Sequence, residues 1–353
     1  MTCDEIVADG VWGMKRILIA LSSFLFAVMA MGQDRAQTHP PLPGKTDLTR
    51  QQWNGNAICY SGYRGAETPQ KDVFPTQAEV LQDLRILEKN WNLIRVYGAD
   101  QHSTDILEVI QKEKLGIKVL LGVWLSGRPD AQAKNQQQVA TGIRLANQYP
   151  EIVAAVSVGN EALVSWSDHK MTEQQMIDRV QFVRKAVHCP VTVADDYLYW
   201  SRADAKLVDY VDFITMHTYP VWGKEDIGTG LSSTIRNYEA VRGAHPGKTI
   251  VLGEVGWPTY TVGEMHAPQA GDEKKQKRYY QEIVAWSRAN NVTTFFFEAF
   301  DEPWKGAGTE GHWGLFSEMR KAKLSMQELY PELKPSGPTS PSYSVPATTQ
   351  EAK

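Results

Sequence analysis

Eight short runs of apolar and β-branched residues alternate with helix-like runs along most of this 353-residue chain. Such runs are typical of strands that are buried on both faces of a parallel sheet. Parallel neighbours need a long crossover connection, and the helix-like runs supply one after each strand. The predicted strands are Ala57–Tyr60, Leu93–Tyr97, Lys118–Trp124, Ile152–Gly159, Val191–Asp195, Phe213–His217, Thr249–Gly253 and Thr294–Phe300.

The helix-like runs carry start signals of their own. Thr76-Gln-Ala-Glu79 and Thr172-Glu-Gln-Gln175 are capping boxes, in which a threonine begins the helix and the third residue after it returns a hydrogen bond. The helix that follows Thr172 is expected to end near Val187, and the fifth helix is expected to be short. The remaining predictions are Ser103–Glu113, Gln136–Gln148, Ala203–Val208, Leu231–Ala244, Asp272–Asn290 and, in the last helix, Ser325–Tyr330.

Eight strand–helix units favour a single α/β domain folded as a (β/α)8 TIM barrel. The alternative is a doubly wound open sheet, which usually shows a glycine-rich phosphate turn after its first strand. Tyr60-Ser-Gly-Tyr-Arg-Gly65 does not match such a turn. We therefore predict a barrel domain over residues 53–334.

Two glutamates come directly after predicted strands four and seven. Glu161 follows Asn160, and Glu254 precedes Val-Gly-Trp257-Pro258. In a parallel barrel the catalytic groups lie at the C-terminal ends of strands, and strands four and seven face each other across the barrel mouth. A pair of carboxylates so placed is what the cleavage of a glycosidic bond requires. The alternative is that each glutamate is a surface loop residue or part of a buried ion pair.

Several longer motifs carry a resemblance to a known family. Val158-Gly-Asn-Glu161 and Gly253-Glu-Val-Gly-Trp-Pro258 resemble the two signatures of glycoside hydrolase family 17, the β-1,3-glucanase family. Arg95-Val-Tyr-Gly98, Phe297-Glu-Ala-Phe-Asp-Glu-Pro-Trp-Lys305 and His312-Trp-Gly-Leu-Phe316 are similar to that family too. The resemblance extends from Ala57 to Phe316, and the motifs follow in the expected order on the expected strands.

The resemblance implies a retaining double displacement with Glu161 as acid/base and Glu254 as nucleophile. Asn160 would bind the 2-hydroxyl of the sugar at the cleavage site, and Tyr219 would hold the nucleophile in orientation. The implied substrate-binding residues are Tyr60, Arg95, Tyr97, Asn160, Tyr219, Trp257, Glu302, Trp304, Lys305 and Trp313. The alternatives are core packing for the aromatic residues, a plain turn for the asparagine and an exposed ion pair for Glu302 with Lys305.

The expected reaction is hydrolysis of β-1,3-glucosidic bonds in a laminarin-type glucan. Plant members of the family have Glu-Thr-Gly-Trp-Pro where this chain has Glu254-Val-Gly-Trp-Pro258, and the strand-eight motif looks more like bacterial and fungal members. That branch includes glucanosyltransferases, so transfer to another sugar is the second expectation. A glucan-binding barrel that has lost catalysis is a third, and the intact glutamate pair argues against it.

Composition excludes several partner classes. The net charge is −4 with no basic cluster, so nucleic acid and anionic lipid are not expected. The 11 tryptophans and 14 tyrosines suit a neutral sugar such as a β-1,3-glucan polysaccharide or oligosaccharide. We predict a monomer with no cofactor and no metal. Asp195 and His217 end neighbouring strands and His102 is placed in a loop, but no pair of histidines has metal-ligand spacing.

The two ends of the chain differ in composition from the barrel domain between them. Lys15-Arg16 precedes an apolar run, Ile17–Ala30, which is short for a membrane span and typical of a cleaved signal peptide. We expect a signal region at 1–32 with its true start at Met14, a flexible lead-in at 33–52 and a disordered tail at 335–353. The protein is then secreted or periplasmic; the alternative is an uncleaved anchor.

Two cysteines would remain after cleavage. Cys59 ends the first predicted strand, whereas Cys189 precedes the fifth, so they lie on opposite sides and at opposite ends of a barrel. A disulfide needs Cα atoms within about 7 Å. We therefore predict two free thiols.

Overall fold

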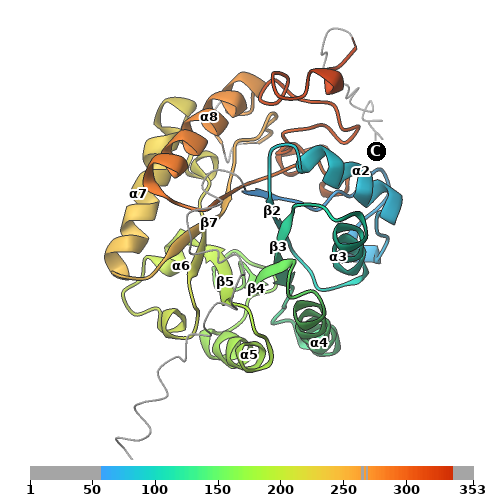
Figure 1. The fold of residues 1–353 in the computed structure, drawn as a ribbon. Coiled ribbons are helices and arrows are strands. Elements are labelled where there is room, and N and C mark those ends of the chain that lie inside the picture. Colours follow the sequence, from blue (N-terminus) through green and yellow to red (C-terminus); the bar gives the residue numbers. More distant parts are fainter. Residues whose placement is uncertain (1–56, 264–265, 268, 337–353) are drawn as a thin grey trace, which may run out of the picture. The chain divides into compact units, whose positions relative to one another are not determined.

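Eight parallel strands close into a barrel in the order of the sequence, with β8 returning to pair with β1. The computed structural model describes residues 57–263, 266–267 and 269–336. Figure 1 shows the helices arranged around the strands. The predicted (β/α)8 barrel is confirmed. The strands are β1 Ala57–Cys59, β2 Leu93–Val96, β3 Lys118–Val123, β4 Val153–Asn160, β5 Val191–Asp196, β6 Ile214–His217, β7 Ile250–Val255 and β8 Thr294–Phe296.

Two helices begin where their capping residues predict, whereas α3, α4 and α7 begin a few residues before their predicted starts. Thr76 and Thr172 both form complete capping boxes at the starts of α2 and α5. The fifth crossover is short, as predicted, but its four-residue α-helix precedes the predicted run Ala203–Val208, which holds only part of a 3-10 turn, η4 Lys206–Asp209. The α-helices are α2 Gln77–Leu87, α3 Gln101–Glu113, α4 Gln132–Gln148, α5 Glu173–Ala186, α6 Tyr197–Trp200, α7 Ile227–Ala244 and α8 Glu273–Asn290.

Four local predictions were wrong. Glu254 lies inside β7 rather than after it, and His102 lies in α3 rather than in a loop. Strand β8 ends at Phe296 and not at Phe300. Beyond its end, Ala299 N–H donates to the carbonyl oxygen of Cys59 at the barrel mouth. Ser325–Tyr330 forms turns instead of a helix. That run is short, and the proline that follows disfavours helical backbone at the residue before it.

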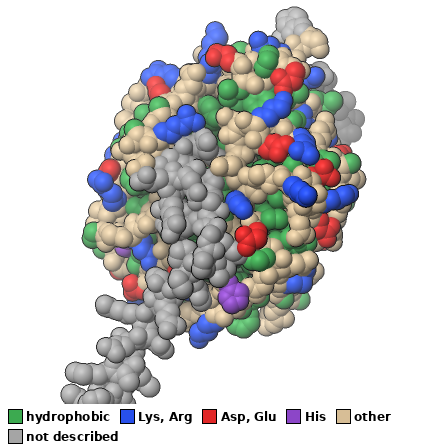
Figure 2. All heavy atoms as spheres, in the orientation of Figure 1, with side chains coloured by type: hydrophobic (Ala, Val, Ile, Leu, Met, Phe, Trp, Pro, Cys, Tyr) green, Lys and Arg blue, Asp and Glu red, His purple; other side chains and the backbone are tan. Residues whose placement is uncertain are grey.

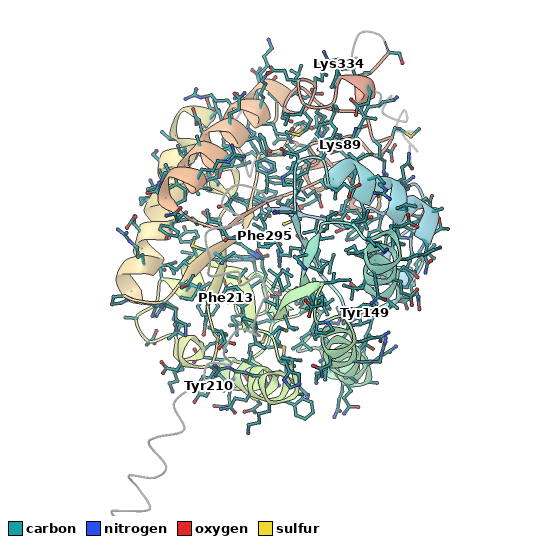
Figure 3. The ribbon with its side chains drawn as sticks, viewed as in Figure 1. Lys89, Tyr149, Tyr210, Phe213, Phe295 and Lys334 are labelled. Carbon is teal, nitrogen blue, oxygen red and sulfur yellow. The ribbon has the colours of Figure 1, made fainter. Side chains whose placement is uncertain are left out.

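Two apolar layers hold the barrel. The larger lies between the strands and the surrounding helices, and the smaller fills the barrel interior. Figure 3 shows Phe213 and Phe295 of this inner layer in the middle of the barrel, while Tyr149 and Tyr210 lie toward the helices. A packed interior closes the barrel to solvent below its mouth, so chemistry is confined to the C-terminal ends of the strands.

The prediction that these two cysteines form no disulfide is confirmed, because Cys59 and Cys189 are both buried thiols. Burial raises the pKa of the Cys59 thiol to about 12. Its Sγ donates to the carbonyl oxygen of Gly253 at 3.4 Å. A buried thiol of raised pKa is a packing group and not a nucleophile.

The predicted signal region 1–32 and lead-in 33–52 lie outside the described residues, as does 337–353 of the predicted tail. Each helix that the structure does describe is too short or too polar to cross a bilayer. Figure 2 shows basic and acidic side chains interspersed over the described part of the visible face.

Candidate active site

The fold brings the two predicted glutamates together at the barrel mouth. Glu161 follows the last residue of β4, and Glu254 is the penultimate residue of β7. One carboxylate oxygen of each and a ring nitrogen of His217 all lie within 4.8 Å of one another. Both carboxylates can therefore reach a single bond of a substrate.

An irregular end of β4 turns the side chain of Glu161 toward the mouth. The register shifts after Ser157, and Gly159 has φ +81°, a left-handed conformation in which a side chain would meet the Met176 methyl group at 2.6 Å. Glu161 itself has φ +46°, which is uncommon for a residue other than glycine. Its N–H donates to the carbonyl of Ala194 at 2.9 Å, which ties this backbone to β5.

Glu254 is held by donors on both of its oxygens. Arg95 forms a buried ion pair with Oε1, and the hydroxyl of Tyr219 donates to Oε2 at 2.5 Å. Burial alone would raise the pKa of Glu254. The charges of His217 and Arg95, with the two hydrogen bonds, outweigh it and lower that pKa to about 2. Glu254 is therefore an ionised carboxylate in a site from which water is mostly excluded.

Arg95 links Glu254 to Asn160. Its Nη2 donates to Asn160 Oδ1 at 2.5 Å, and its guanidinium carbon lies 4.5 Å from the centre of the Tyr97 ring. Burial would lower the pKa of Arg95, but Tyr97 and Glu254 raise it. Arg95 does not line the cavity, so the structure places it behind the reacting groups, where it orients a carboxylate and an amide. The amide hydrogens of Asn160 remain as its donors.

His217 lies between the two glutamates. Its Nδ1 is 2.9 Å from Glu161 Oε1 and 3.5 Å from Glu254 Oε2, and its side chain is fully buried. The sequence predicts only a structural or substrate-side role for this histidine. His217 is the last residue of β6 and pairs in register with Glu254 of β7, so its place at the end of a strand next to the strand of Glu254 is the signal for a closer role.

The distances among these three side chains would also allow them to bind a metal ion. Glu161, His217 and Glu254 offer ligand atoms close enough to share an ion. However, both oxygens of Glu254 already accept hydrogen bonds, and one of them pairs with the guanidinium of Arg95. A cation would have to displace these donors beside a fixed positive charge. The arrangement suits an acid–nucleophile pair better, and the absence of a metal stays a prediction.

A cavity of about 1760 Å³ opens above the glutamate pair. Its volume exceeds the range of about 300–1,000 Å³ that small ligands need, so it has room for several sugar units. Trp124, Trp166 and Trp222 also line it, and none of these three was a predicted site residue. The predicted residues that line it are Tyr60, Tyr97, Asn160, Glu161, Tyr219, Glu254, Glu302, Trp304, Lys305 and Trp313.

A family model, the BtgE/BtgC glycoside hydrolase domain, matches residues 57–314. The chain belongs to this family. It is 30% identical to a putative glucan endo-1,3-β-glucosidase, btgC, of Aspergillus niger, over 70% of this chain and 40% of that protein. It is 29% identical to a glucan 1,3-β-glucosidase of Arthroderma benhamiae, over 70% of this chain and 84% of that one. The chain thus spans less than half the length of the Aspergillus relative.

Solved structures agree with this family. An endo-laminarinase from Formosa is similar with a TM-score of 0.69 and 26% identity, over 79% of this chain and 88% of its own. A family 17 β-1,3-glucanosyltransferase from Rhizomucor miehei shares the fold with a TM-score of 0.65 and 23% identity, over 76% and 96%. The resemblance to glycoside hydrolase family 17 is confirmed.

Two of the predicted substrate-binding residues of this BtgE/BtgC-type barrel, Trp257 and Arg95, do not line the cavity. Trp257 is fully buried outside the cavity, where its ring packs beside Gly230 and its Nε1 donates to the carbonyl of Ala270. It therefore joins α7 to β7 instead of stacking on a sugar. Tyr60 does line the cavity, but its hydroxyl donates to Asp83 at 3.2 Å and is already engaged.

Glu302 is buried and the side chain of Lys305 is only 17% exposed, so the alternative of an exposed ion pair is wrong. Lys305 Nζ pairs with Glu302 Oε2 and lies 3.4 Å from Glu298 Oε1. Burial raises the pKa of Glu298, and the Glu302 charge raises it further. The pKa of Glu302 would also rise on burial, but Lys305 and hydrogen bonds lower it. One proton and one lysine thus neutralise two buried carboxyls at the cavity wall.

We expect Lys305→Met to lower the free energy of unfolding by about 3–5 kcal/mol, because it leaves the Glu302 charge buried without its cation. Adding Glu302→Gln should recover part of that loss, since the two residues share one interaction. Urea unfolding of the three variants measures both effects. The control is Lys277→Met, which breaks an exposed pair with Glu328 and should change stability by less than about 1 kcal/mol.

We expect Tyr219→Phe to move the acidic limb of kcat/KM to higher pH. Glu254 reacts only when ionised, and its lowered pKa keeps it ionised into acid. Removing the Tyr219 hydrogen bond raises that pKa by about one to two units, since such a bond is worth about 1.5–3 kcal/mol. The control is Tyr280→Phe, which removes a buried hydroxyl bonded to Asn90 outside the cavity. An unshifted acidic limb would contradict this role of Tyr219.

Proposed function

We propose that this protein is a retaining glycoside hydrolase that cleaves β-1,3-glucosidic bonds in glucans. The observation that carries the proposal is the spacing of Glu161 and Glu254, whose oxygens approach within 4.8 Å. Retaining enzymes hold their two carboxyl groups about 5–5.5 Å apart, whereas inverting enzymes need about 6.5–9.5 Å to admit a water molecule. A pair this close favours direct attack on the sugar.

The first step forms a glycosyl-enzyme. Glu254 attacks the anomeric carbon as a carboxylate, and its pKa of about 2 keeps it in that form. Glu161 donates a proton to the departing glycosidic oxygen. Its side chain is 27% exposed against 7% for Glu254, which suits a group that must reach the leaving chain and later an incoming water molecule.

The second step releases the sugar. Glu161, now a carboxylate, takes a proton from water as the water oxygen bonds to the anomeric carbon, and Glu254 leaves. Arg95 and Tyr219 stabilise the returning carboxylate through the contacts that they already make. Asn160 is positioned by Arg95 to bind the 2-hydroxyl of the reacting sugar, where a hydrogen bond strengthens in the transition state.

The relatives support β-1,3-glucan as the substrate class. Those from Aspergillus niger and Arthroderma benhamiae are named for glucan 1,3-β-glucosidase activity, and the Formosa relative is named an endo-laminarinase. The large cavity with Trp304 and Trp313 in its wall suits a chain of neutral sugars. Transfer to a second sugar is the alternative outcome of the same intermediate. A non-catalytic glucan-binding barrel is not favoured, since it needs no ionised Glu254 beside a second carboxyl.

Incubation with linear laminari-oligosaccharides of defined length tests the proposal. Shorter products with the β anomer formed first support retaining hydrolysis, and the length distribution separates endo from exo attack. Products longer than the substrate indicate transfer. No product from any β-1,3-linked substrate, with a folded protein, would overturn the proposed function.

We also propose that the protein is secreted through a leader at 1–32 and acts as a monomer, without nucleic acid or membrane partners. The basic Lys15-Arg16 followed by the apolar Ile17–Ala30 supports export. N-terminal sequencing of the exported protein tests cleavage, and light scattering tests the monomer. A mature protein that still begins before residue 30 would contradict cleavage.

A further inference from the structure

Trp166 is a large aromatic residue exposed in the wall of the cavity that also holds the glutamate pair. It lies five residues after Glu161, lines the same cavity and leaves 57% of its surface exposed. Scattered small apolar groups are common on surfaces, but an exposed tryptophan in a cavity wall marks a place where something binds. The proposed mechanism assigns Trp166 no role.

The loop that carries Trp166 is tied down on both sides of it. Leu163 N–H donates to Asp195 Oδ2 at 2.9 Å, and His169 Nε2 lies 2.7 Å from the carbonyl oxygen of Asn160. The second contact joins the loop to the residue next to Glu161. The indole is thus presented by an ordered loop at a fixed place relative to the proposed acid.

A second exposed apolar side chain lines the cavity on the neighbouring strand's loop. Leu198 is the second residue of α6 and is 49% exposed. Its N–H donates to Asp196 Oδ1 at 2.8 Å, and Asp196 also lines the cavity. The loops after β4 and β5 therefore offer two apolar surfaces with a carboxyl group nearby, which matches the apolar faces and hydroxyl edge of a sugar.

The surroundings of Glu254 are different. Trp313 is buried there, with its ring 5.0 Å from Tyr219 and 5.8 Å from Phe297. The nucleophile thus lies among enclosed aromatic rings, whereas the acid lies beside an open apolar rim. In a retaining reaction the acid protonates the leaving group, so the departing or incoming chain lies on the side of Glu161.

We propose that Trp166 and Leu198 form a binding site for an acceptor saccharide, namely the hydroxyl-bearing end of a second glucan chain. This proposal rests on the proposed retaining mechanism. The acceptor oxygen bonds to the anomeric carbon, its proton passes to Glu161, and the ester bond to Glu254 breaks to release the carboxylate. Trp166 favours this outcome over hydrolysis because it raises the local concentration of sugar hydroxyl relative to water.

An aryl β-laminaribioside as donor and laminaritriose as acceptor test this site. Release of the aryl group reports formation of the glycosyl-enzyme, and chromatography measures the ratio of transfer to hydrolysis products as acceptor is added. Trp166→Ala should lower that ratio about tenfold, the upper end of what an aromatic contact is worth. Leu198→Ala should lower it less. Phe182→Ala is the control, because Phe182 is 59% exposed on α5 and lies outside the cavity.

Each outcome decides the proposal. The acceptor site is supported if Trp166→Ala lowers the ratio of transfer to hydrolysis. Trp166→Phe should then lower that ratio by less than about threefold, and Phe182→Ala should leave it unchanged. A ratio for Trp166→Ala equal to wild type, or a wild type that transfers to no acceptor, overturns the site and leaves the glycosidase function standing. Failure of the wild type to release the aryl group overturns the proposed function and the acceptor site with it.

Discussion

Glu254→Gln is expected to lower kcat/KM on laminarin by at least about 10⁴-fold, because the reaction loses its covalent nucleophile. The amide cannot form the glycosyl ester, and no other carboxylate that the structure describes at the mouth takes its place opposite Glu161. Release of reducing sugar measures the loss. Glu282→Gln on α8 is the matched control, since its carboxylate pairs with Arg278 one turn away on the same helix and does not line the cavity.

The substitution also leaves Arg95 buried without its anion, so folding must be followed beside activity. A measurement on the native protein avoids this difficulty. A 2-fluoro glycoside slows the second step, and mass spectrometry then locates the trapped sugar on the peptide that contains Glu254. A trapped sugar on any other residue, or a folded Glu254→Gln variant that keeps a tenth of its activity, would refute the assignment.

Glu161→Gln is expected to have the second largest effect, and its size should depend on the leaving group. On laminarin the loss should be about 10²–10⁴-fold, the usual contribution of a general acid. On an aryl glycoside with an acidic phenol the first step should be affected much less, because that leaving group departs without protonation. Steady-state and burst kinetics on the two substrates separate the steps.

A small anion distinguishes this role from simple damage to the site. Azide needs no general base, so it should restore turnover of the aryl glycoside by the Glu161→Gln variant and yield a β-glycosyl azide. Wild type and Glu254→Gln should show no such restoration. Equal losses on both substrates, without an azide product, would mean that Glu161 is not the acid/base.

Much of the barrel could be predicted from the sequence because its strands are local patterns. Apolar β-branched runs mark strands wherever they lie in a fully buried sheet, and the two capping boxes mark helix starts. The order of strands then places Glu161 and Glu254 on opposite sides of one mouth. Strand ends were less predictable, as at β8, because the last ladder bonds depend on neighbours far along the chain.

The tryptophans show the limit of this reasoning. Trp257 lies in a motif next to Glu254 and was predicted to bind sugar, yet it packs beside Gly230 in the core. Trp166 lies in a loop without any periodic pattern and was not predicted, yet it lines the cavity. Burial depends on which element packs over a side chain, and no local pattern at either residue contains that information.

The sequence by itself determined that the chain forms a (β/α)8 barrel with one glutamate at each of two facing strand ends. Only the tertiary structure decided how those glutamates differ. Arg95 and Tyr219 come from β2 and from the loop after β6, and together with His217 they make Glu254 a stable anion beside the more exposed Glu161. The pKa of a carboxyl depends on the charges and burial around it, and these are set by residues that meet only when the barrel closes.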